Sequence, residues 1–69
     1  MARTNTAMRD FVKRVGSDEE AGRLLGLAPL TIRSLRKGVR PVQPKYAEQI
    51  EVLTEGEISR VDLVWPKAP

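Results

Sequence analysis

Glycine and proline occur in this sequence at intervals that leave room only for short helices. Glycine is favoured just past a helix C-terminus, and proline is favoured at the first helical position. Four glycines follow segments whose apolar residues recur at helical spacing: Gly16, Gly26, Gly38 and Gly56. Pro29 and Pro44 stand where the third and fourth of these segments begin. The sequence therefore predicts an all-α fold, a small domain of four to five helices.

Residues able to cap helices indicate where the first two helices begin. Asn5 or Thr6 is expected to cap the first helix. Ser17 opens a capping box, in which its hydroxyl accepts from the Glu20 N–H while the Glu20 carboxylate reaches back to the Ser17 N–H.

The expected helices after the first run from Ser17 to about Leu25, over 29–37, and from Pro44 to about Thr54. The tail over 57–65 suits either a short helix or a strand, and we favour the helix. The apolar residues expected to face the core are Met8, Phe11, Val12, Val15, Ala21, Leu24, Leu25, Ile32, Leu35, Ala47 and Ile50, with Val52 or Leu53 as further candidates.

Length and composition exclude several classes of protein. A chain of 69 residues supports one domain, which we expect to span 1–69 with a core at about 5–65 and short flexible ends. Cysteine and histidine are absent, so we expect no disulfide, no metal site and no cofactor. With no glycine-rich phosphate loop either, an enzyme with a small-molecule substrate is not expected. The polar N-terminus does not resemble a signal peptide and no apolar run approaches the length of a membrane span, so we expect a cytoplasmic protein.

Charge is distributed unevenly along the chain. Residues 23–45 contain six basic side chains and no acidic one, whereas residues 46–62 contain five acidic side chains and one basic one. A separate acidic cluster, Asp18 to Glu20, precedes the basic stretch. This polarity indicates one face for a polyanion and another turned away from it. The alternative is that both stretches are simply solvated surfaces.

The outward side of the expected helix over 29–37 carries chemistry suited to the major groove of DNA. Arginine bonds guanine edges, serine bonds either type of base, and apolar side chains contact thymine methyl groups. The candidate base contacts are Pro29, Leu30, Arg33 and Ser34. Phosphates supply affinity and register, and the candidate phosphate contacts are Ser17, Arg23, Thr31, Arg36, Lys37 and Arg40. Leu30 also has two other interpretations, an isolated exposed apolar residue or a core residue.

Two stretches, AGRLLGLAPLTIRSLRKGVRPV and IEVLTEGEISRVDLVWP, resemble the Cro-type repressors of temperate phages, in particular their YdaS-like antitoxin branch of helix-turn-helix proteins. The resemblance covers about residues 18–66. It implies a lambda-repressor-like, dimeric DNA-binding protein from a phage, prophage or other mobile element. Three residues depart from the family pattern: Gly22 replaces an alanine, Ala28 replaces a capping serine, and Leu30 is less polar than the usual base reader.

The sequence thus predicts a transcriptional repressor that binds double-stranded DNA at a palindromic operator, as a homodimer, with helix 29–37 in the major groove. The candidate dimer contacts are Ile58, Leu63, Val64 and Trp65. Trp65 has a second interpretation as a lid on the monomer core. The main rival is an antitoxin-like protein-interaction module whose DNA binding is secondary, and a third candidate is nonspecific architectural DNA binding.

Overall fold

The computed structural model describes residues 4–65 of the chain, and residues 1–3 and 66–69, which belong to the expected flexible ends, lie outside the described residues. Within this range the chain forms five helices and no strand, which confirms the all-α prediction. The helices are α1 (Thr6–Val15), α2 (Asp18–Leu25), α3 (Pro29–Arg36), α4 (Pro44–Leu53) and α5 (Arg60–Val64). The tail is therefore helical, and α3 and α4 each end one residue before the predicted position.

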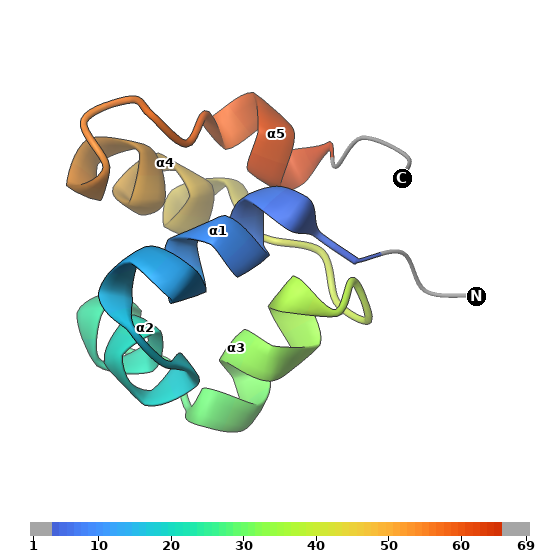
Figure 1. Cartoon of the computed structure of the whole chain (residues 1–69). Coiled ribbons are helices and arrows are strands. Elements are labelled where there is room, and N and C mark those ends of the chain that lie inside the picture. The colour runs from blue at the N-terminus through green and yellow to red at the C-terminus, as the bar shows by residue number, and fades with distance from the viewer. Residues whose placement is uncertain (1–3, 66–69) are drawn as a thin grey trace.

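Helix α1 lies in the middle of the fold (Figure 1). It packs against α2, α3 and α5, while α2 packs on α3 and α4 packs on α5. Figure 1 shows the α2–α3 pair on one side of α1 and the α4–α5 pair on the other. The basic residues of α3 and the acidic residues of α4 and α5 are thereby separated in space as well as in sequence.

The helix ends follow local capping chemistry. Asn5, not Thr6, caps α1, because its side-chain oxygen accepts from the Met8 N–H at 3.0 Å. Ser17 Oγ accepts from the Glu20 N–H at 3.2 Å. The reciprocal half of the predicted capping box is not formed, since the Glu20 carboxylate accepts from Arg23 Nη2 at 2.7 Å instead.

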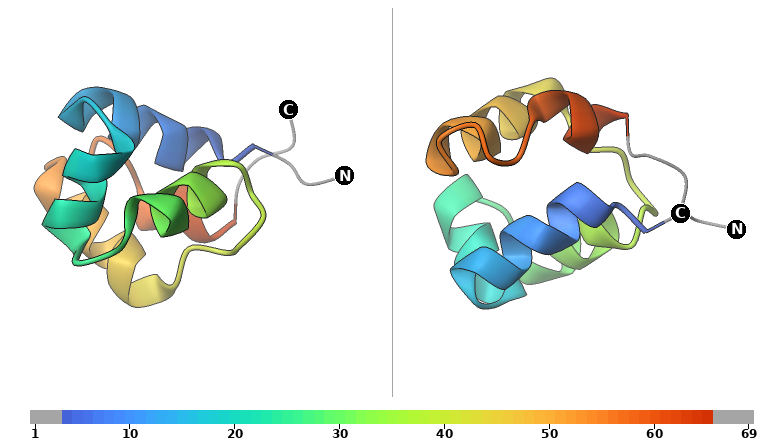
Figure 2. Two further views of the ribbon diagram at one scale, coloured as in Figure 1. Left: turned by 90° about the horizontal axis from the view of Figure 1, so that it is seen from below. Right: turned by 45° about the horizontal axis from the view of Figure 1, so that its top comes forward.

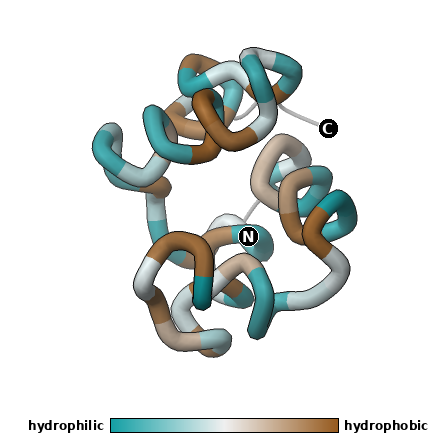
Figure 3. The backbone as a smooth tube through the Cα atoms, turned by 90° about the vertical axis from the view of Figure 1, so that its left-hand side faces the viewer, coloured by the Kyte–Doolittle hydropathy of each residue, from teal (hydrophilic) through white to brown (hydrophobic). Residues whose placement is uncertain are grey.

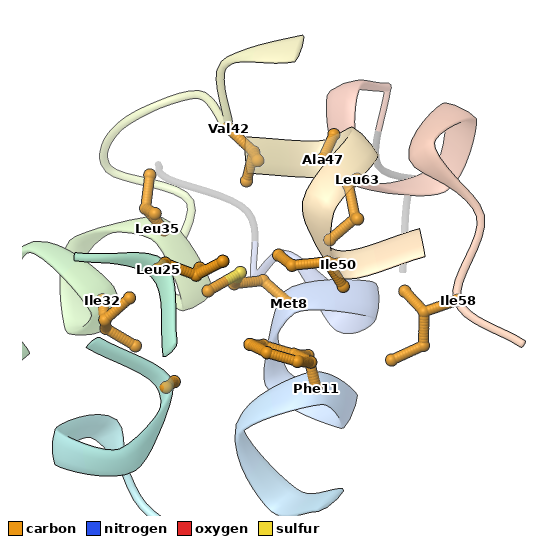
Figure 4. Close-up of a cluster of buried hydrophobic side chains, with 11 residues drawn as sticks. Met8, Phe11, Leu25, Ile32, Leu35, Val42, Ala47, Ile50, Ile58 and Leu63 are labelled. Atoms are coloured by element: carbon orange, nitrogen blue, oxygen red, sulfur yellow. The ribbon is translucent and has the colours of Figure 1, made fainter. Parts of the chain in front are cut away.

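The buried apolar side chains gather into one cluster that draws on all five helices (Figure 4). Its members are Met8, Phe11, Ala21, Leu25, Ile32, Leu35, Val42, Ala47, Ile50, Ile58 and Leu63. Val12 and Val15 pack against the cluster and are only partly buried. Val42, in the connection between α3 and α4, joins the core although it lies outside every helix. Figure 3 shows that apolar and polar residues alternate along the helices. This pattern is expected of amphipathic helices that turn one face to the core.

Three predicted core residues are exposed instead. Leu24 is 48%, Val52 70% and Leu53 49% accessible to solvent. On α2 the core takes Ala21 and Leu25, and on α4 it takes Ala47 and Ile50. Leu24, Val52 and Leu53 instead line an open groove between α2 and α4, so the prediction that they face inward is wrong.

Asn5 is a buried polar residue that connects three helices. Its side chain is 2% exposed, and its Nδ2 group donates to the Leu63 carbonyl at 3.0 Å. Its backbone N–H donates to the Arg36 carbonyl at 2.9 Å. Together with the cap on Met8, these bonds fasten the start of α1 to the end of α3 and to α5.

Close packing explains the glycine at position 22. Gly22 is buried, and its carbonyl accepts from the Leu27 N–H at 2.8 Å as the chain turns back after α2. A methyl group at Gly22 would overlap the backbone carbonyl oxygen of Leu27. An alanine at position 22 therefore does not fit this turn, because the obstacle is backbone and not a movable side chain.

Gly22→Ala is expected to lower the free energy of unfolding by about 1–2 kcal/mol. Overlap with backbone places the cost in the upper half of the about 1–3 kcal/mol typical of overpacking, so a loss of about 1–2 kcal/mol remains after the gain of about 1 kcal/mol in helix propensity. Urea unfolding followed by circular dichroism measures the change. An unchanged or higher midpoint for the variant would contradict the close approach at Leu27.

Candidate nucleic-acid interface

Helices α2 and α3 are joined by a turn of three residues. Gly26 adopts the left-handed conformation with φ 72°, which a glycine accepts without strain. Leu27 is half-buried against the core, and Ala28 precedes Pro29 at the first position of α3 without a side-chain hydrogen bond to cap the helix. This turn fixes where the outward side of α3 faces.

Helix α3 buries Ile32 and Leu35 in the core, and its outward side lies opposite these two residues. Leu30 is 75% exposed, which excludes a core role for it. Pro29, Arg33 and Lys37 are exposed, and Ser34 is half-buried. At about 100° per residue, Leu30, Arg33, Ser34 and Lys37 form one stripe pointing away from the core.

Two cations of this stripe and one in the loop after it form no ion pair in the described part of the chain. Arg33, Lys37 and Arg40 are exposed and form no ion pair within residues 4–65. The loop after α3 is held close to the helix, because the N–H groups of Val39 and Arg40 donate to the Ser34 carbonyl at 3.0 and 3.3 Å. Arg40 therefore extends the positive charge of α3 beyond its last turn.

Two of the predicted phosphate contacts are bound within the domain. Arg36 makes a bidentate pair with Asp18, with Nε–Oδ1 at 2.9 Å and Nη2–Oδ2 at 3.0 Å. Both side chains are partly buried, so in this structure Arg36, a predicted phosphate contact, is engaged by a carboxylate. Its guanidinium instead joins the end of α3 to the start of α2. Arg23 pairs with Glu20, but its side chain is 75% exposed and this surface pair is weak.

The Asp18–Arg36 pair makes the stability of the domain depend on acid. Hydrogen bonding to Arg36 lowers the pKa of Asp18 below its ordinary 3.8, although partial burial opposes the shift. A carboxyl with a lowered folded-state pKa stabilises the fold at any pH above its ordinary value, and this contribution is lost as pH falls through the lowered pKa.

We therefore expect the free energy of unfolding to decline below about pH 4, and Asp18→Asn to reduce that decline. At neutral pH the free energy of unfolding of Asp18→Asn should be about 1 kcal/mol lower than that of wild type. Urea unfolding between pH 7 and pH 2 measures both effects. Glu19→Gln is the control, because Glu19 is exposed and makes no ion pair in the described part of the chain. Equal acid sensitivity of Asp18→Asn and wild type would refute the role of this pair.

The structure adds two basic residues that the sequence analysis missed. Arg9 and Lys13 lie one turn apart on α1 and are exposed. They line a shallow cleft of about 400 Å³ together with Ser17, Asp18 and Arg36. The only sequence signal was their spacing of four residues on α1. Packing of α1 against α2 and α3 brings them to the start of α2, beside the predicted contact Ser17.

A second depression lies between α3 and the start of α4. Thr31 and Arg40, two predicted phosphate contacts, line it together with Gln43 and Tyr46, and its volume is about 300 Å³. Thr31 is half-buried, whereas Arg40 and Gln43 are exposed. The structure thus brings Thr31 and Arg40 together beside α3, and Gln43 is a polar neighbour that the sequence analysis did not single out.

Of the four predicted dimer contacts, two are core residues. Ile58 is 6% and Leu63 0% exposed, so the prediction that they contact a second copy is wrong. Both residues cover the core on the side of α5: Leu63 lies in α5, and Ile58 lies just before it. A helix as short as α5 buries only one face, and here that face packs on the core. Val64 is partly buried against the core. Trp65 is 72% exposed, which rules out the lid interpretation.

Metal sites and membrane-spanning helices were also sought among the described residues. No group of three or more His, Cys, Asp or Glu side chains that would hold a metal ion occurs among the residues that the structure describes. None of the described helices is long and apolar enough to cross a membrane. Comparisons with protein-family models, curated proteins and solved structures found no match to this chain.

Proposed function

We propose that this protein is a sequence-specific DNA-binding transcriptional repressor, in which α2 and α3 act as a helix-turn-helix and α3 enters the major groove. The observation that carries the proposal is the outward stripe of α3, which presents Leu30, Arg33, Ser34 and Lys37 to solvent on a helix with no acidic residue. A helix of eight residues with one core face fits the major groove of B-form DNA, which is about 12 Å wide.

Base reading is assigned to the first turns of α3. Arg33 is free to bond a guanine edge in bidentate fashion, because no carboxylate within residues 4–65 holds it. Ser34 supplies a hydroxyl for either type of base, and Leu30 supplies an apolar surface for a thymine methyl group. Pro29 at the helix start brings this end of α3 close to the groove wall without an N–H to satisfy.

Phosphate contacts are assigned to the cations on either side of α3. Lys37 and Arg40 lie at its C-terminal end, and Arg9 and Lys13 flank the start of α2. The other assigned contacts are Ser17, Arg23 and Thr31. Contacts of this kind hold the register of a protein on the duplex and carry no sequence information of their own.

The biological role rests on the resemblance to Cro-type repressors. It supports a lambda-repressor-like fold, a phage, prophage or mobile-element origin, and binding of a palindromic operator by a homodimer. Symmetric operators suit such a dimer because two recognition helices then read half-sites about one turn of DNA apart.

Selection of bound duplexes from a random DNA pool tests the proposal. The selected duplex and a scrambled control are then titrated by fluorescence anisotropy at about 50 and 200 mM salt. We expect a two-fold-symmetric selected sequence, much tighter binding to it than to the control, and weaker binding to both at high salt. Equal, salt-dependent binding to every duplex would favour nonspecific architectural binding.

An antitoxin-like protein-interaction module is the second candidate function, favoured by a specific observation. Leu24, Val52 and Leu53 leave an apolar groove open to solvent between α2 and α4. A partner seated on apolar surface would be insensitive to salt, in contrast to a DNA contact. Absence of DNA binding at low salt would favour this module over the repressor.

A further inference from the structure

Leu30 is the large apolar side chain on the outward stripe of α3. It is 75% exposed in the first turn of the helix, and Arg33 lies one turn further along. The other large apolar side chains exposed in the described range lie outside α3, and they are Leu24, Val39, Val52, Leu53, Val61 and Trp65. An isolated exposed leucine needs no explanation in itself. The position of Leu30 carries meaning because its neighbours on the stripe are the polar side chains that the proposed function assigns to bases.

The outward side of α3 is open to a large ligand. In the left view of Figure 2, which looks from below, α3 faces the viewer and none of the other described helices crosses in front of it. The N-terminal residues of a recognition helix are the ones that contact base edges. Leu30 is the second residue of α3, so even a side chain as short as leucine reaches a base when this end of the helix lies in the groove.

A leucine side chain detects only one of the groups that bases present in the major groove. It has no hydrogen-bond donor or acceptor, so it does not distinguish the O4 acceptor of thymine from the N4 donor of cytosine. The C5-methyl group of thymine is the apolar feature of that groove. Uracil is thymine without this methyl group, and 5-methylcytosine is cytosine with it. Leu30 is therefore suited to separate methylated from unmethylated pyrimidines, whatever their hydrogen-bonding groups.

The spacing of Leu30 and Arg33 relates the methyl group to a guanine. Side chains three residues apart on a helix have Cβ atoms about 5–6 Å from each other. Successive base pairs are about 3.4 Å apart, so this separation lies between one and two base-pair steps. The Arg33 side chain is long and forms no ion pair within residues 4–65, which leaves it free to lean toward the nearer pair. The two residues thus fit adjacent base pairs.

We propose that α3 recognises a C5-methyl group on the base pair next to a guanine, with Leu30 as the contact to the methyl group. Because Leu30 reads the methyl group alone, 5-methylcytosine takes the place of thymine at this position. Methylation of a cytosine there turns a weaker site into a tighter one without a change in sequence. The inference rests on the proposed function in that α3 must lie in the major groove. It concerns this chain and not the resembled family, whose residue at this position is more polar.

Single methyl groups of the operator test the inference. Replacing thymine with deoxyuridine in the selected duplex removes the C5-methyl group and leaves every hydrogen-bonding group in place. At the thymine next to the guanine, we expect binding to weaken about 3- to 10-fold for each methyl group removed, measured by fluorescence anisotropy at one salt concentration. When cytosine replaces this thymine, the duplex with 5-methylcytosine should bind about 3- to 10-fold more tightly than the duplex with cytosine.

Two variants assign the effect to Leu30. Leu30→Ala should bind the thymine and deoxyuridine duplexes alike, to within about twofold, because its side chain no longer reaches the methyl group. Val39→Ala is the matched control, since Val39 is an exposed aliphatic residue in the loop after α3 and lies off the stripe. This control should keep the full difference between the two duplexes. Thermal melts followed by circular dichroism establish that both variants are folded.

Each outcome bears on the proposal. Weaker binding to deoxyuridine, tighter binding to 5-methylcytosine and loss of both differences in Leu30→Ala support methyl recognition. A selected operator without thymine next to guanine overturns methyl recognition and leaves the repressor standing. The same holds for binding that ignores the methyl group, and for a methyl effect that persists in Leu30→Ala. A random pool that yields no preferred sequence overturns the repressor, and methyl recognition with it.

Discussion

Replacing Asn5 with alanine is expected to lower the free energy of unfolding by about 2–4 kcal/mol. Loss of an N-cap costs about 1 kcal/mol, and a buried carbonyl left without a donor costs about 1–3 kcal/mol more. Asn5 supplies both groups, since its Oδ1 accepts from the Met8 N–H and its Nδ2 donates to the Leu63 carbonyl. Urea unfolding followed by circular dichroism measures the loss.

Two further variants separate the contributions. Asn5→Ser keeps a cap for α1, but the serine side chain is too short to reach Leu63. Its free energy of unfolding should therefore fall only by the contribution of the hydrogen bond to the Leu63 carbonyl. Thr6→Ala alters the exposed neighbour and should change stability by less than about 0.5 kcal/mol. If the free energy of unfolding of Asn5→Ala differs from that of wild type by less than about 0.5 kcal/mol, the buried hydrogen bonds of Asn5 do not hold α1 to α5.

Replacing Arg33 with alanine is expected to weaken binding to the selected operator about 5- to 150-fold. This range corresponds to about 1–3 kcal/mol for one bidentate contact to guanine. Binding to a scrambled duplex should change much less, so the ratio between the two affinities should fall. Anisotropy titration of both duplexes at one salt concentration gives this ratio.

Lys37 and Arg40 give the contrasting result, because phosphate contacts do not distinguish sequences. Lys37→Ala or Arg40→Ala should weaken binding to both duplexes alike and reduce the slope of log affinity against log salt by about 1. Arg36→Ala should leave the slope unchanged and lower stability, since its guanidinium is held by Asp18. If Arg33→Ala weakens both duplexes equally, Arg33 contacts phosphate and α3 does not read bases through it.

Helix boundaries were predictable because they depend on interactions within a few residues. The left-handed glycine after α2, the proline at the start of α3 and the Ser17 hydroxyl at the start of α2 each act on backbone groups nearby in sequence. Such interactions operate before any tertiary contact exists. The outward position of Arg33 followed from the same periodicity, whereas for Leu30 the sequence left a core position open and the structure decided for exposure.

The direction of other side chains was not predictable from periodicity. Apolar spacing identifies which residues share a face, but a neighbouring element decides whether that face is covered. Leu24 and Val52 are exposed because the groove between α2 and α4 stays open to solvent, whereas Leu63 is buried because α5 packs against α1. The pairing of Arg36, predicted as a phosphate contact, with Asp18 was not foreseen because Asp18 is 18 residues away in sequence.

The sequence by itself therefore determined the helical class, the places where helices begin and end, and the basic stripe of α3, since all of these depend on local backbone chemistry and helical period. Only the tertiary structure decided which charges remain free, which apolar residues form the core and which form the groove on α4. These depend on the packing of helices that are distant in sequence, and that packing pairs Asp18 with Arg36, joins Asn5 to Leu63 and leaves Arg33 unpaired within the described residues.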